Sequence, residues 1–389
     1  MTESAEFELP TQEDFHCDLR TLCLGAIRLT LETLLNEEVR ALVGAGKWQR
    51  LASRKDMRNG SYLRRLVTSM GLVELDVPRA RAGGSPSGVL GRYKRRAAEV
   101  DDAITAAYVH GISTRKMGEV TDALMGERVG RSTVSRVTRS LEERVEALRS
   151  ERIEEAMPYL YLDATFLDAR WARNVENVSA LVAYAVGEDG HRKLLAITIG
   201  AQESEASWSE LLAQLIERGL RGLKLVIADA HAGLAAAVRK YLPEVPQQRC
   251  TVHLERNVLA KTPQRLRGRM AREVSRIFDS PSLAEAKARL GQLQLGLGKQ
   301  LPEAMACLEN GFAAATRFYA FPKKHWRRIR STNGLERLHG EIKRRIRAVG
   351  AFPDRGSALR LITAVALHVT GIWGDRRYLD IDEENRKAA

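Results

Sequence analysis

The chain has 389 residues and a formal net charge of +13 at pH 7, with 62 Lys and Arg against 49 Asp and Glu. This length predicts two or three domains, and the basic balance favours a polyanionic partner, the alternative being a basic enzyme without one. Four unevenly spaced cysteines argue against a disulfide framework, the apolar runs are too short for a membrane span, and the acidic start does not resemble a secretory signal.

A helical pattern opens the chain, because residues 15–57 place apolar side chains at three- and four-residue spacing. The Arg-rich stretch 58–84 contains two short extended segments with a turn at Met70 and Gly71, and it predicts a small hairpin. We therefore assign residues 1–99 to an N-terminal DNA-binding domain made of helices and a small Arg-rich β element.

A second helical region, residues 100–150, predicts a helix-turn-helix DNA-binding domain. Its last two helices, predicted over 113–126 and 131–148, are joined by a short Gly-containing turn, and the second is rich in Ser, Thr and Arg. In this interpretation five side chains face phosphates or base edges: Arg131, Ser132, Thr133, Ser135 and Arg136. The alternative is a three-helix bundle with a solvated basic face, since many such domains bind no DNA.

Beyond Pro158 the apolar pattern changes from helical to strand-like spacing. The predicted elements are strands at 159–168, 178–189 and 193–200, a helix at 203–220, a strand at 223–230, a helix at 233–243 and a strand at 247–253. Three successive strands followed by alternating helices and strands predict a mixed α/β sheet, the order found in RNase H-like nucleotidyltransferase cores. Residues 151–253 form the first part of this predicted core.

The next region, from about 254 to 320, has no strand pattern. Helices are predicted at 264–278, 282–297 and 302–318. They form an all-α insertion, assigned to residues 254–325, because a compact sheet does not carry a structureless loop of this length. The last part of the core, residues 326–389, contains an apolar helix at 357–373 that is expected to pack on the sheet.

Two aspartates in predicted strands are candidate catalytic residues. Asp163 lies in the middle of its strand, and Asp168, five residues later, points to the opposite face because side chains alternate along a strand. Asp229 lies at the carboxyl end of its strand, where open α/β sheets place their ligands. We expect Asp163 and Asp229 to share one site, and the alternative for Asp229 is a cap on the following helix.

A third acid, Glu336, lies in a basic helix within STNGLERLHGEIKRR. Two alternatives stay open. Glu336 can form a capping box with Asn333, or Glu341, about 140° further round the helix, can be the third acid instead. The basic stretch 323–347 predicts a phosphate-binding track, although a solvated helix face has the same pattern. Its candidate residues are Lys323, Lys324, Arg337, Lys343, Arg344 and Arg345.

Two strand carboxylates and one helix carboxylate can bind a pair of divalent cations, which clamp the attacking and leaving oxygens of a phosphodiester. In so basic a chain the expected phosphodiester is nucleic acid. Cys250 and His253 are metal-ligand types, but a structural zinc site needs four ligands, so packing at a strand-to-helix junction is expected. Trp208 can stack on a flipped base or act as a buried anchor.

Several short blocks occur in a fixed order along the chain. They are LDVPRAR at 75–81, YLDAT around Asp163, IADAHAGL around Asp229, QRCTVHLERN at 248–257 and STNGLERLHGEIKRR around Glu336. Their order and spacing resemble the mutator-type transposases of bacterial insertion sequences over most of the chain. Two departures occur: His339 stands where that family usually has Asn, and Phe166-Leu167 follow LDAT, where Tyr or Lys is usual. Neither is expected to touch the acids.

The resemblance implies an RNase H-like DDE core with an α-helical insertion, and it carries the three acids onto Asp163, Asp229 and Glu336. It also carries the family's C-x-x-H pair onto Cys250 and His253. It implies two Mg²⁺ ions, with Mn²⁺ able to substitute. The implied partner is double-stranded DNA, both terminal inverted repeats and target, bound by a homodimer that makes a circular intermediate. We expect a bacterial cytoplasmic protein on the nucleoid, with no membrane partner.

The expected reaction has two steps at one site: water nicks the end of the element, and the freed 3′-hydroxyl then joins strands. Two other classes stay open. An RNase H-type nuclease would hydrolyse without joining strands. A helix-turn-helix regulator would carry an inactive sheet domain, against which the intact acids argue.

Overall fold

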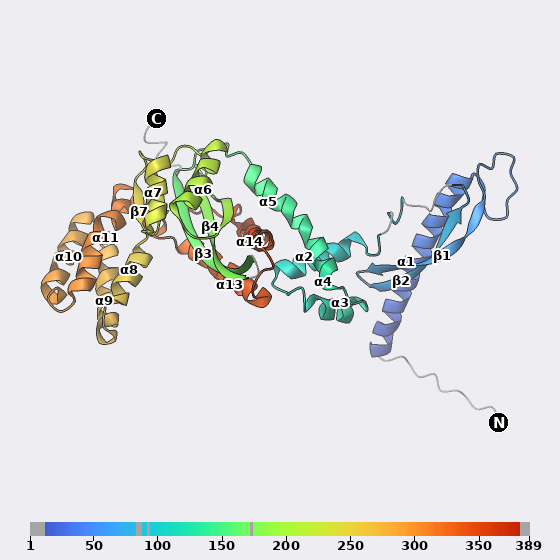
Figure 1. The fold of residues 1–389 in the computed structure, drawn as a ribbon, viewed down its shortest axis with the longest axis horizontal. Coiled ribbons are helices and arrows are strands. Elements are labelled where there is room, and N and C mark those ends of the chain that lie inside the picture. Colours follow the sequence, from blue (N-terminus) through green and yellow to red (C-terminus); the bar gives the residue numbers. More distant parts are fainter. Residues whose placement is uncertain (1–11, 83–87, 92–93, 172–173, 382–389) are drawn as a thin grey trace, which may run out of the picture. The chain divides into compact units, whose positions relative to one another are not determined.

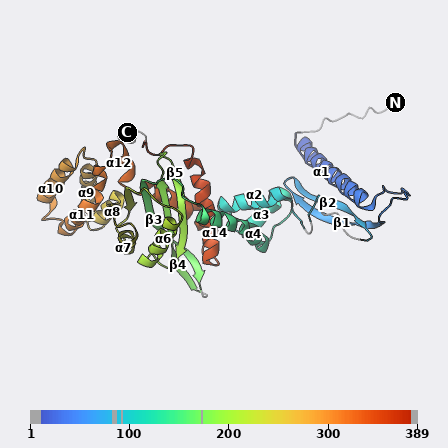
Figure 2. The same cartoon turned by 90° about the horizontal axis from the view of Figure 1, so that it is seen from above.

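The computed structural model describes residues 12–82, 88–91, 94–171 and 174–381. The chain divides into two compact units, Met1–Arg139 and Ser140–Ala389. The first contains a long helix, a hairpin and short helices, whereas the second contains a sheet covered by helices (Figures 1 and 2).

The first unit begins with helix α1 (Gln12–Val43) packed on an antiparallel hairpin of β1 (Arg58–Thr68) and β2 (Gly71–Ala80). The register places Thr68 opposite Gly71, and Gly71 has φ +140°, a conformation that favours glycine. The shared core joins Leu35 of α1 to Leu66, Val73, Leu75 and Val77 of the hairpin. The predicted hairpin and its turn are confirmed.

Three short helices complete this unit: α2 (Ala98–Val109), α3 (Met117–Met125) and α4 (Arg131–Val137). The predicted single helix over 131–148 is wrong, because a 3₁₀ turn at Thr138–Ser140 separates α4 from α5 (Leu141–Ser150). The Thr138 hydroxyl donates to the Ser135 carbonyl at 3.3 Å, an i to i−3 contact that fits the tighter 3₁₀ geometry.

The second unit is built on a five-stranded mixed sheet with the order β5-β4-β3-β6-β7. Its strands are β3 (Tyr159–Trp171), β4 (Asn174–Val186), β5 (Arg192–Gly200), β6 (Leu225–Ala228) and β7 (Gln247–Arg249). The first three pair antiparallel, while β6 pairs parallel with both β3 and β7. The prediction of a mixed α/β sheet is confirmed.

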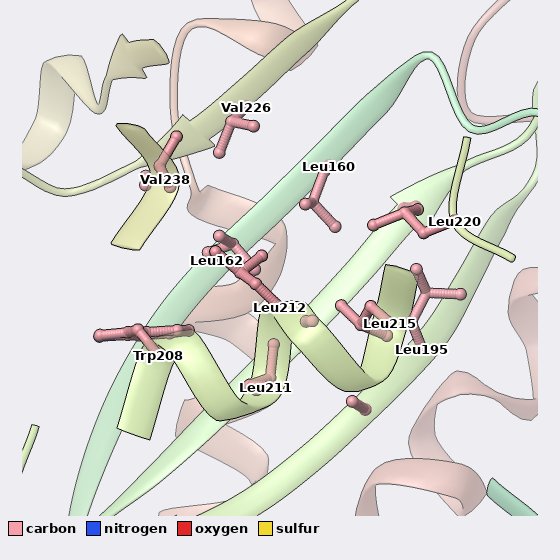
Figure 3. Packing of buried hydrophobic residues seen from close by; sticks show 14 of the residues in the cluster. Leu160, Leu162, Leu195, Trp208, Leu211, Leu212, Leu215, Leu220, Val226 and Val238 are labelled. Carbon is pink, nitrogen blue, oxygen red and sulfur yellow. The ribbon is translucent and has the colours of Figure 1, made fainter. Parts of the chain in front are cut away.

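The two faces of the sheet carry different helices. On one face, α6 (Glu205–Glu217) and α7 (Ala232–Tyr241) bury an apolar core that includes Leu160 and Leu162 of β3 and Trp208 and Leu211 of α6 (Figure 3). On the other face the alternate residues of β3, Tyr161 among them, meet later segments of the chain. These segments are α12 (Lys323–Ile329), α13 (Asn333–Val349) and α14 (Arg355–Thr370).

Between β7 and α12 the chain is helical, as predicted. The helices are α8 (Thr251–Ala260), α9 (Gln264–Phe278), α10 (Leu283–Leu297) and α11 (Pro302–Ala315). The predicted strand over 247–253 is partly wrong, because β7 ends at Arg249. Leu254 N donates to Cys250 O, so helical hydrogen bonding begins at Cys250 and His253 lies in the first turn of α8.

Helix α14 and the residues after it, Arg355–Trp373, form the one segment of the described chain that is long and apolar enough to cross a membrane by length and composition. Half of its apolar window is buried inside the protein. The helix packs against β3, β5 and α5, as a core helix does. The prediction that this helix packs back on the sheet is confirmed.

Candidate active site

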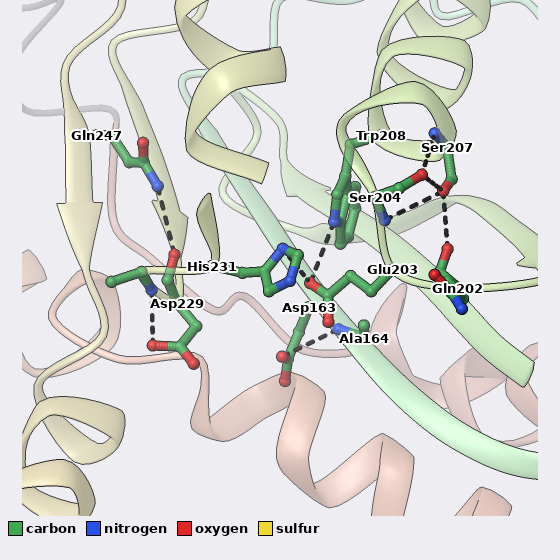
Figure 4. Close-up of polar contacts among 11 residues, drawn as sticks. Asp163, Ala164, Gln202, Glu203, Ser204, Ser207, Trp208, Asp229, His231 and Gln247 are labelled. Atoms are coloured by element: carbon green, nitrogen blue, oxygen red, sulfur yellow. Dashed lines mark hydrogen bonds and ion pairs between the residues drawn. The ribbon is translucent and has the colours of Figure 1, made fainter. Parts of the chain in front are cut away.

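Asp163 and Asp229 lie side by side where β6, an inner strand of the sheet, ends next to β3. The parallel register of β3 and β6 pairs Leu162 with Ala228, and each aspartate is the next residue on its chain. Neighbouring strands lie about 4.8 Å apart, so this register alone brings the two carboxylates to one place. In Figure 4 both side chains point to the same side of the strands.

Asp163 and Asp168 lie on opposite faces of β3, as the sequence predicts. Asp163 is 9% exposed, whereas Asp168 is exposed on the opposite face, where it accepts a hydrogen bond from Asn177. The reason is the strict alternation of β3, in which Thr165 is buried on the same face as Asp163 while Phe166 is exposed.

Each aspartate keeps one local hydrogen bond. Asp163 Oδ1 accepts from Ala164 N at 3.0 Å, and Asp229 Oδ1 accepts from Ala230 N at 2.6 Å. Helix α7 has His231 as its N-cap residue with no side-chain cap hydrogen bond, so Asp229 does not cap it. The alternative that Asp229 caps the following helix is therefore wrong.

His339 contacts Asp163 directly. The Nδ1 atom of His339 lies 3.4 Å from Asp163 Oδ2, and the histidine side chain is 8% exposed. Its Nε2 is buried without a hydrogen-bond partner among the described residues. The expectation that His339 would not touch the acids was wrong, because α13 packs against β3 and turns this position toward the strand.

Glu336 lies in the first turn of α13, close to the strands. The capping-box alternative is absent: Thr332 is the N-cap residue and makes no side-chain cap hydrogen bond. The helix approaches β4 closely at Gly334, where an added Cβ would lie 2.5 Å from the Tyr184 hydroxyl oxygen. A glycine is therefore required for α13 to hold Glu336 in this position.

Arg256 of α8 forms an ion pair with the carboxylate of Glu336. Its two terminal nitrogens donate to Oε1 at 2.6 Å and to Oε2 at 3.0 Å, a bidentate pair. This hydrogen bonding, followed by the charges of Glu336 and other groups that include Asp163, raises the pKa of Arg256 above its ordinary value. Sequence analysis missed Arg256, although it lies within the QRCTVHLERN block.

His253 connects the three acids electrostatically. Its Nε2 lies 3.6 Å from Glu336 Oε1. Interaction with the Cys250 thiol raises the pKa of His253 to about 9, burial opposes the rise, and the negative charges of Asp229 and Asp163 add to it. Cys250 is fully buried and accepts hydrogen bonds from Thr332 N and its hydroxyl, both at 3.4 Å. The pair thus joins the start of α8 to the start of α13.

A fourth acid, Glu203, lies beside the aspartates and was missed by sequence analysis. It accepts a hydrogen bond from Trp208 Nε1 at 3.1 Å and lies 3.4 Å from His231 Nδ1 (Figure 4). Burial raises the pKa of Glu203, and the charges of Asp163 and Asp229 raise it further, against the lowering effects of Trp208 and His231. Its only sequence signal is an acid directly before the cap of α6.

Trp208 is fully buried under the sheet, so of its two predicted roles the buried anchor is the one observed. Its ring is part of the core formed by α6 and β3. The indole N–H is nevertheless directed at the site, because it fixes the carboxylate of Glu203.

Carboxylate oxygens are the ligands that Mg²⁺ prefers. The positively charged guanidinium of Arg256 lies against the Glu336 carboxylate, where a metal cation would bind. Within the described residues, no three or more His, Cys, Asp or Glu side chains lie close enough together to hold a metal ion. The carboxylate oxygens are thus the right kind of donor for divalent cations, but they are not gathered around one point in this structure, and Arg256 engages the third acid.

The predicted DNA-contacting residues lie in both units. On α4, Arg131, Ser132, Ser135 and Arg136 are exposed and Thr133 is partly exposed. On α12 and α13, Lys323, Lys324, Arg337, Lys343 and Arg344 are exposed. Arg345 differs from the expectation of a surface cation: it is 6% exposed and pairs with Glu341, which also pairs with Arg344. Glu341 is thus engaged with arginines of its own helix, away from the aspartates.

Comparison with known proteins shows a family. The model of the family described as "Transposase, Mutator family" matches residues 3–375. The transposase for insertion sequence element ISRM5 of Rhizobium meliloti is 35% identical over 93% of this chain and 92% of its own. The transposase for IS256 in transposon Tn4001 of Staphylococcus aureus is 35% identical over 90% and 91%. The transposase for IS1081 of Mycobacterium tuberculosis is 34% identical over 95% and 89%.

Proposed function

This chain belongs to the Mutator family of transposases, and on that premise we propose that it cuts and joins DNA strands at the ends of an insertion sequence through Asp163, Asp229 and Glu336. The observation that carries the proposal is the register of β3 and β6, which makes Asp163 and Asp229 neighbours at the carboxyl end of β6. His253 supports including Glu336 in the site. It contacts Glu336, and the charges of both aspartates raise its pKa.

The sheet order and the helical insertion before α13 support an RNase H-like DDE core. The three carboxylates would hold Mg²⁺, or Mn²⁺ in its place, and such ions supply activation of the attacking oxygen and stabilisation of the leaving one. Glu336 would hold such an ion in place of the guanidinium of Arg256, which pairs with both of its oxygens in this structure. His253, whose imidazole is positively charged at neutral pH, can face a DNA phosphate beside the three acids.

The reaction uses one set of acids twice. Water is the nucleophile when an end is nicked, and the freed 3′-hydroxyl is the nucleophile when strands are joined. Because both steps are displacements at a phosphodiester, neither needs a covalent protein–DNA intermediate.

Recognition of the terminal inverted repeats is assigned to the first unit. Its helices α3 and α4 form a helix-turn-helix candidate, and α4 directs Arg131 and Arg136 to the surface. Lys and Arg of α12 and α13 then bind backbone phosphates near the acids. Two ends must be brought together for joining, so a homodimer is the proposed assembly.

Strand transfer with purified protein tests the proposal. A labelled duplex bearing the terminal repeat is incubated with Mg²⁺ and with Asp163→Asn, Asp229→Asn or Glu336→Gln. We expect losses of at least about 100-fold in nicking and joining, the scale of losing a metal-site contact. Asp168→Asn, on the opposite face of β3, is the matched control, and Glu341→Gln tests the other candidate acid. Circular dichroism checks that each variant folds.

The outcomes separate the candidate functions. Nicking and joining that need the three acids support a transposase. Nicking without joining, indifferent to the repeat sequence, supports an RNase H-type nuclease. Repeat-specific binding with no cleavage in Mg²⁺ or Mn²⁺ supports a regulator. Full activity in Asp163→Asn overturns the proposed site.

A further inference from the structure

A second feature of the sheet-containing unit lies beside α13: a cleft of about 530 Å³ whose lining includes seven arginines and two acids, Glu255 and Asp279. We call it the basic cleft and define it by Arg192, Arg327, Arg328, Arg330, Arg337 and Arg376. These residues come from β5, α12, α13 and the segment after α14. Elements far apart in the sequence therefore place their positive charges around one space.

The arginines of the basic cleft outnumber the two acids in its lining, Glu255 and Asp279. Arg330 pairs with Asp279 at 2.6 Å. For Arg192, Arg328 and Arg337, no ion pair is formed with any described residue. Burial lowers the pKa of Arg192, Tyr184 and Tyr378 oppose this shift, and the neighbouring Arg328 adds to it, so an anion bound beside Arg192 would favour its charged form. Uncompensated cations lining one cleft are the arrangement expected of an anion site.

Two of these arginines are stacked on aromatic rings. The guanidinium of Arg192 lies 4.2 Å from the ring centre of Trp373 and 4.5 Å from that of Tyr378, and Arg328 lies 4.6 Å from Tyr378. Stacking occupies the flat faces of a guanidinium and leaves its N–H donors, which lie in the plane, free to bind an oxyanion. Because the face of Tyr378 is covered by arginines, the cleft suits phosphates better than stacked bases.

Hydrogen bonds hold the stacked residues in place. Tyr378 N donates to Gly190 O at 2.8 Å, which ties the segment after α14 to the turn between β4 and β5. His325 of α12 is fully buried: its Nε2 donates to Asp380 O at 2.9 Å, so its Nδ1 accepts from the Tyr159 hydroxyl at 2.8 Å. This arrangement positions α12, and with it Arg328.

The cleft adjoins the proposed active site. Asn333 and Arg337 line it, and Glu336 lies between them on the first turns of α13. We propose that the basic cleft binds consecutive backbone phosphates of the DNA strand that enters the site of Asp163, Asp229 and Glu336. The inference rests on the proposed function and adds the path of one strand to it.

The salt dependence of DNA binding tests this inference. Affinity for the terminal-repeat duplex is measured by fluorescence anisotropy in metal-free buffer over a series of salt concentrations. Each phosphate contact contributes about 0.9 to the slope of log affinity against log salt. We expect Arg328→Gln and Arg337→Gln each to reduce the steepness of this slope by about that amount and to weaken binding severalfold. Lys299→Gln, an exposed residue after α10, is the equal-charge control and leaves the slope unchanged.

Arg337 is exposed, so its variant tests the inference even if a change at the stacked Arg328 perturbs folding. A wild-type slope in both cleft variants, with DNA bound normally, overturns the cleft assignment and the phosphate-binding role of Arg328 and Arg337, while the proposed chemistry at Asp163, Asp229 and Glu336 stands. An equal change in Lys299→Gln also overturns it, because the effect would then be one of overall charge. If the wild-type protein binds no DNA, both the inference and the proposed function fail.

Discussion

Arg256 and Glu336 form a bidentate ion pair across 80 residues of sequence, with N–O distances of 2.6 and 3.0 Å. The arginine side chain is 58% exposed and the glutamate 24%. Water therefore screens the pair, and its contribution is about 1 kcal/mol or less. A contact of this strength holds Glu336 in place without preventing its exchange for a divalent cation.

Replacing Arg256 by Gln should therefore tighten divalent-cation binding. The competing guanidinium disappears, and about 1 kcal/mol corresponds to roughly a five-fold lower Kd for Mn²⁺, measured by isothermal titration calorimetry without DNA. Arg276→Gln, which removes an exposed ion pair with Glu273 on α9, is the matched control and should leave the Kd unchanged. An unchanged or higher Kd in Arg256→Gln would show that the arginine does not compete for Glu336.

The histidine that contacts Glu336 should be charged at neutral pH. His253 has a pKa raised to about 9, first through Cys250, so its imidazolium persists at pH 7.5 and is lost as the pH rises through about 9. Cys250→Ser should move this pKa down toward 6.5, because the largest stabilising interaction of the charged ring is removed. Histidine NMR chemical shifts followed against pH measure it, with His253→Gln for assignment. Cys307→Ser, in α11, should leave the titration unchanged.

Gly334 should not tolerate a side chain. A Cβ there would lie 2.5 Å from the Tyr184 hydroxyl oxygen, so Gly334→Ala should destabilise the protein by about 1–3 kcal/mol through overpacking. Tyr184→Phe removes the hydroxyl oxygen that the added Cβ would meet, so it should restore much of the loss in the double variant.

Chemical denaturation of the single and double variants measures the coupling between these two positions. Gly340→Ala, on the same helix with no atom within 4 Å of the added Cβ, is the control and should be neutral or stabilising. If Gly334→Ala is equally harmless, α13 does not depend on this close approach.

The Trp208 indole should matter for activity as well as stability. Trp208→Phe removes the N–H bonded to Glu203, which leaves a largely buried carboxylate short of a donor, at a cost of about 1–3 kcal/mol. The pKa of Glu203 should also rise further in this variant, because the hydrogen bond from Trp208 lowers that pKa in the wild-type protein. Trp326→Phe, which loses a similar bond to Phe321 O, is the control. We expect both to lower the unfolding midpoint, and only Trp208→Phe to reduce strand cleavage. Equal cleavage in both variants would confine Glu203 to a structural role.

Local pattern was enough to identify the hairpin turn at Gly71, the helix over 264–278 and the side of β3 on which Asp163 lies. These features depend on residues close in sequence, through glycine conformation, helical spacing and strand alternation. The same reasoning placed Asp229 at a strand end. The register of β6 with β3 then shows that Asp229 lies beside Asp163.

The tertiary structure alone decided what surrounds these acids. The pairing of Arg256 with Glu336, the contact of His339 with Asp163 and the nearness of Glu203 to both aspartates depend on the order of the strands and on how α8, α13 and the start of α6 pack on them. No local spacing encodes such contacts, because their free energy is gained only when distant segments are brought together by burial of the core. The arginines of the basic cleft are scattered along the sequence for the same reason, and they become one site only in the folded chain.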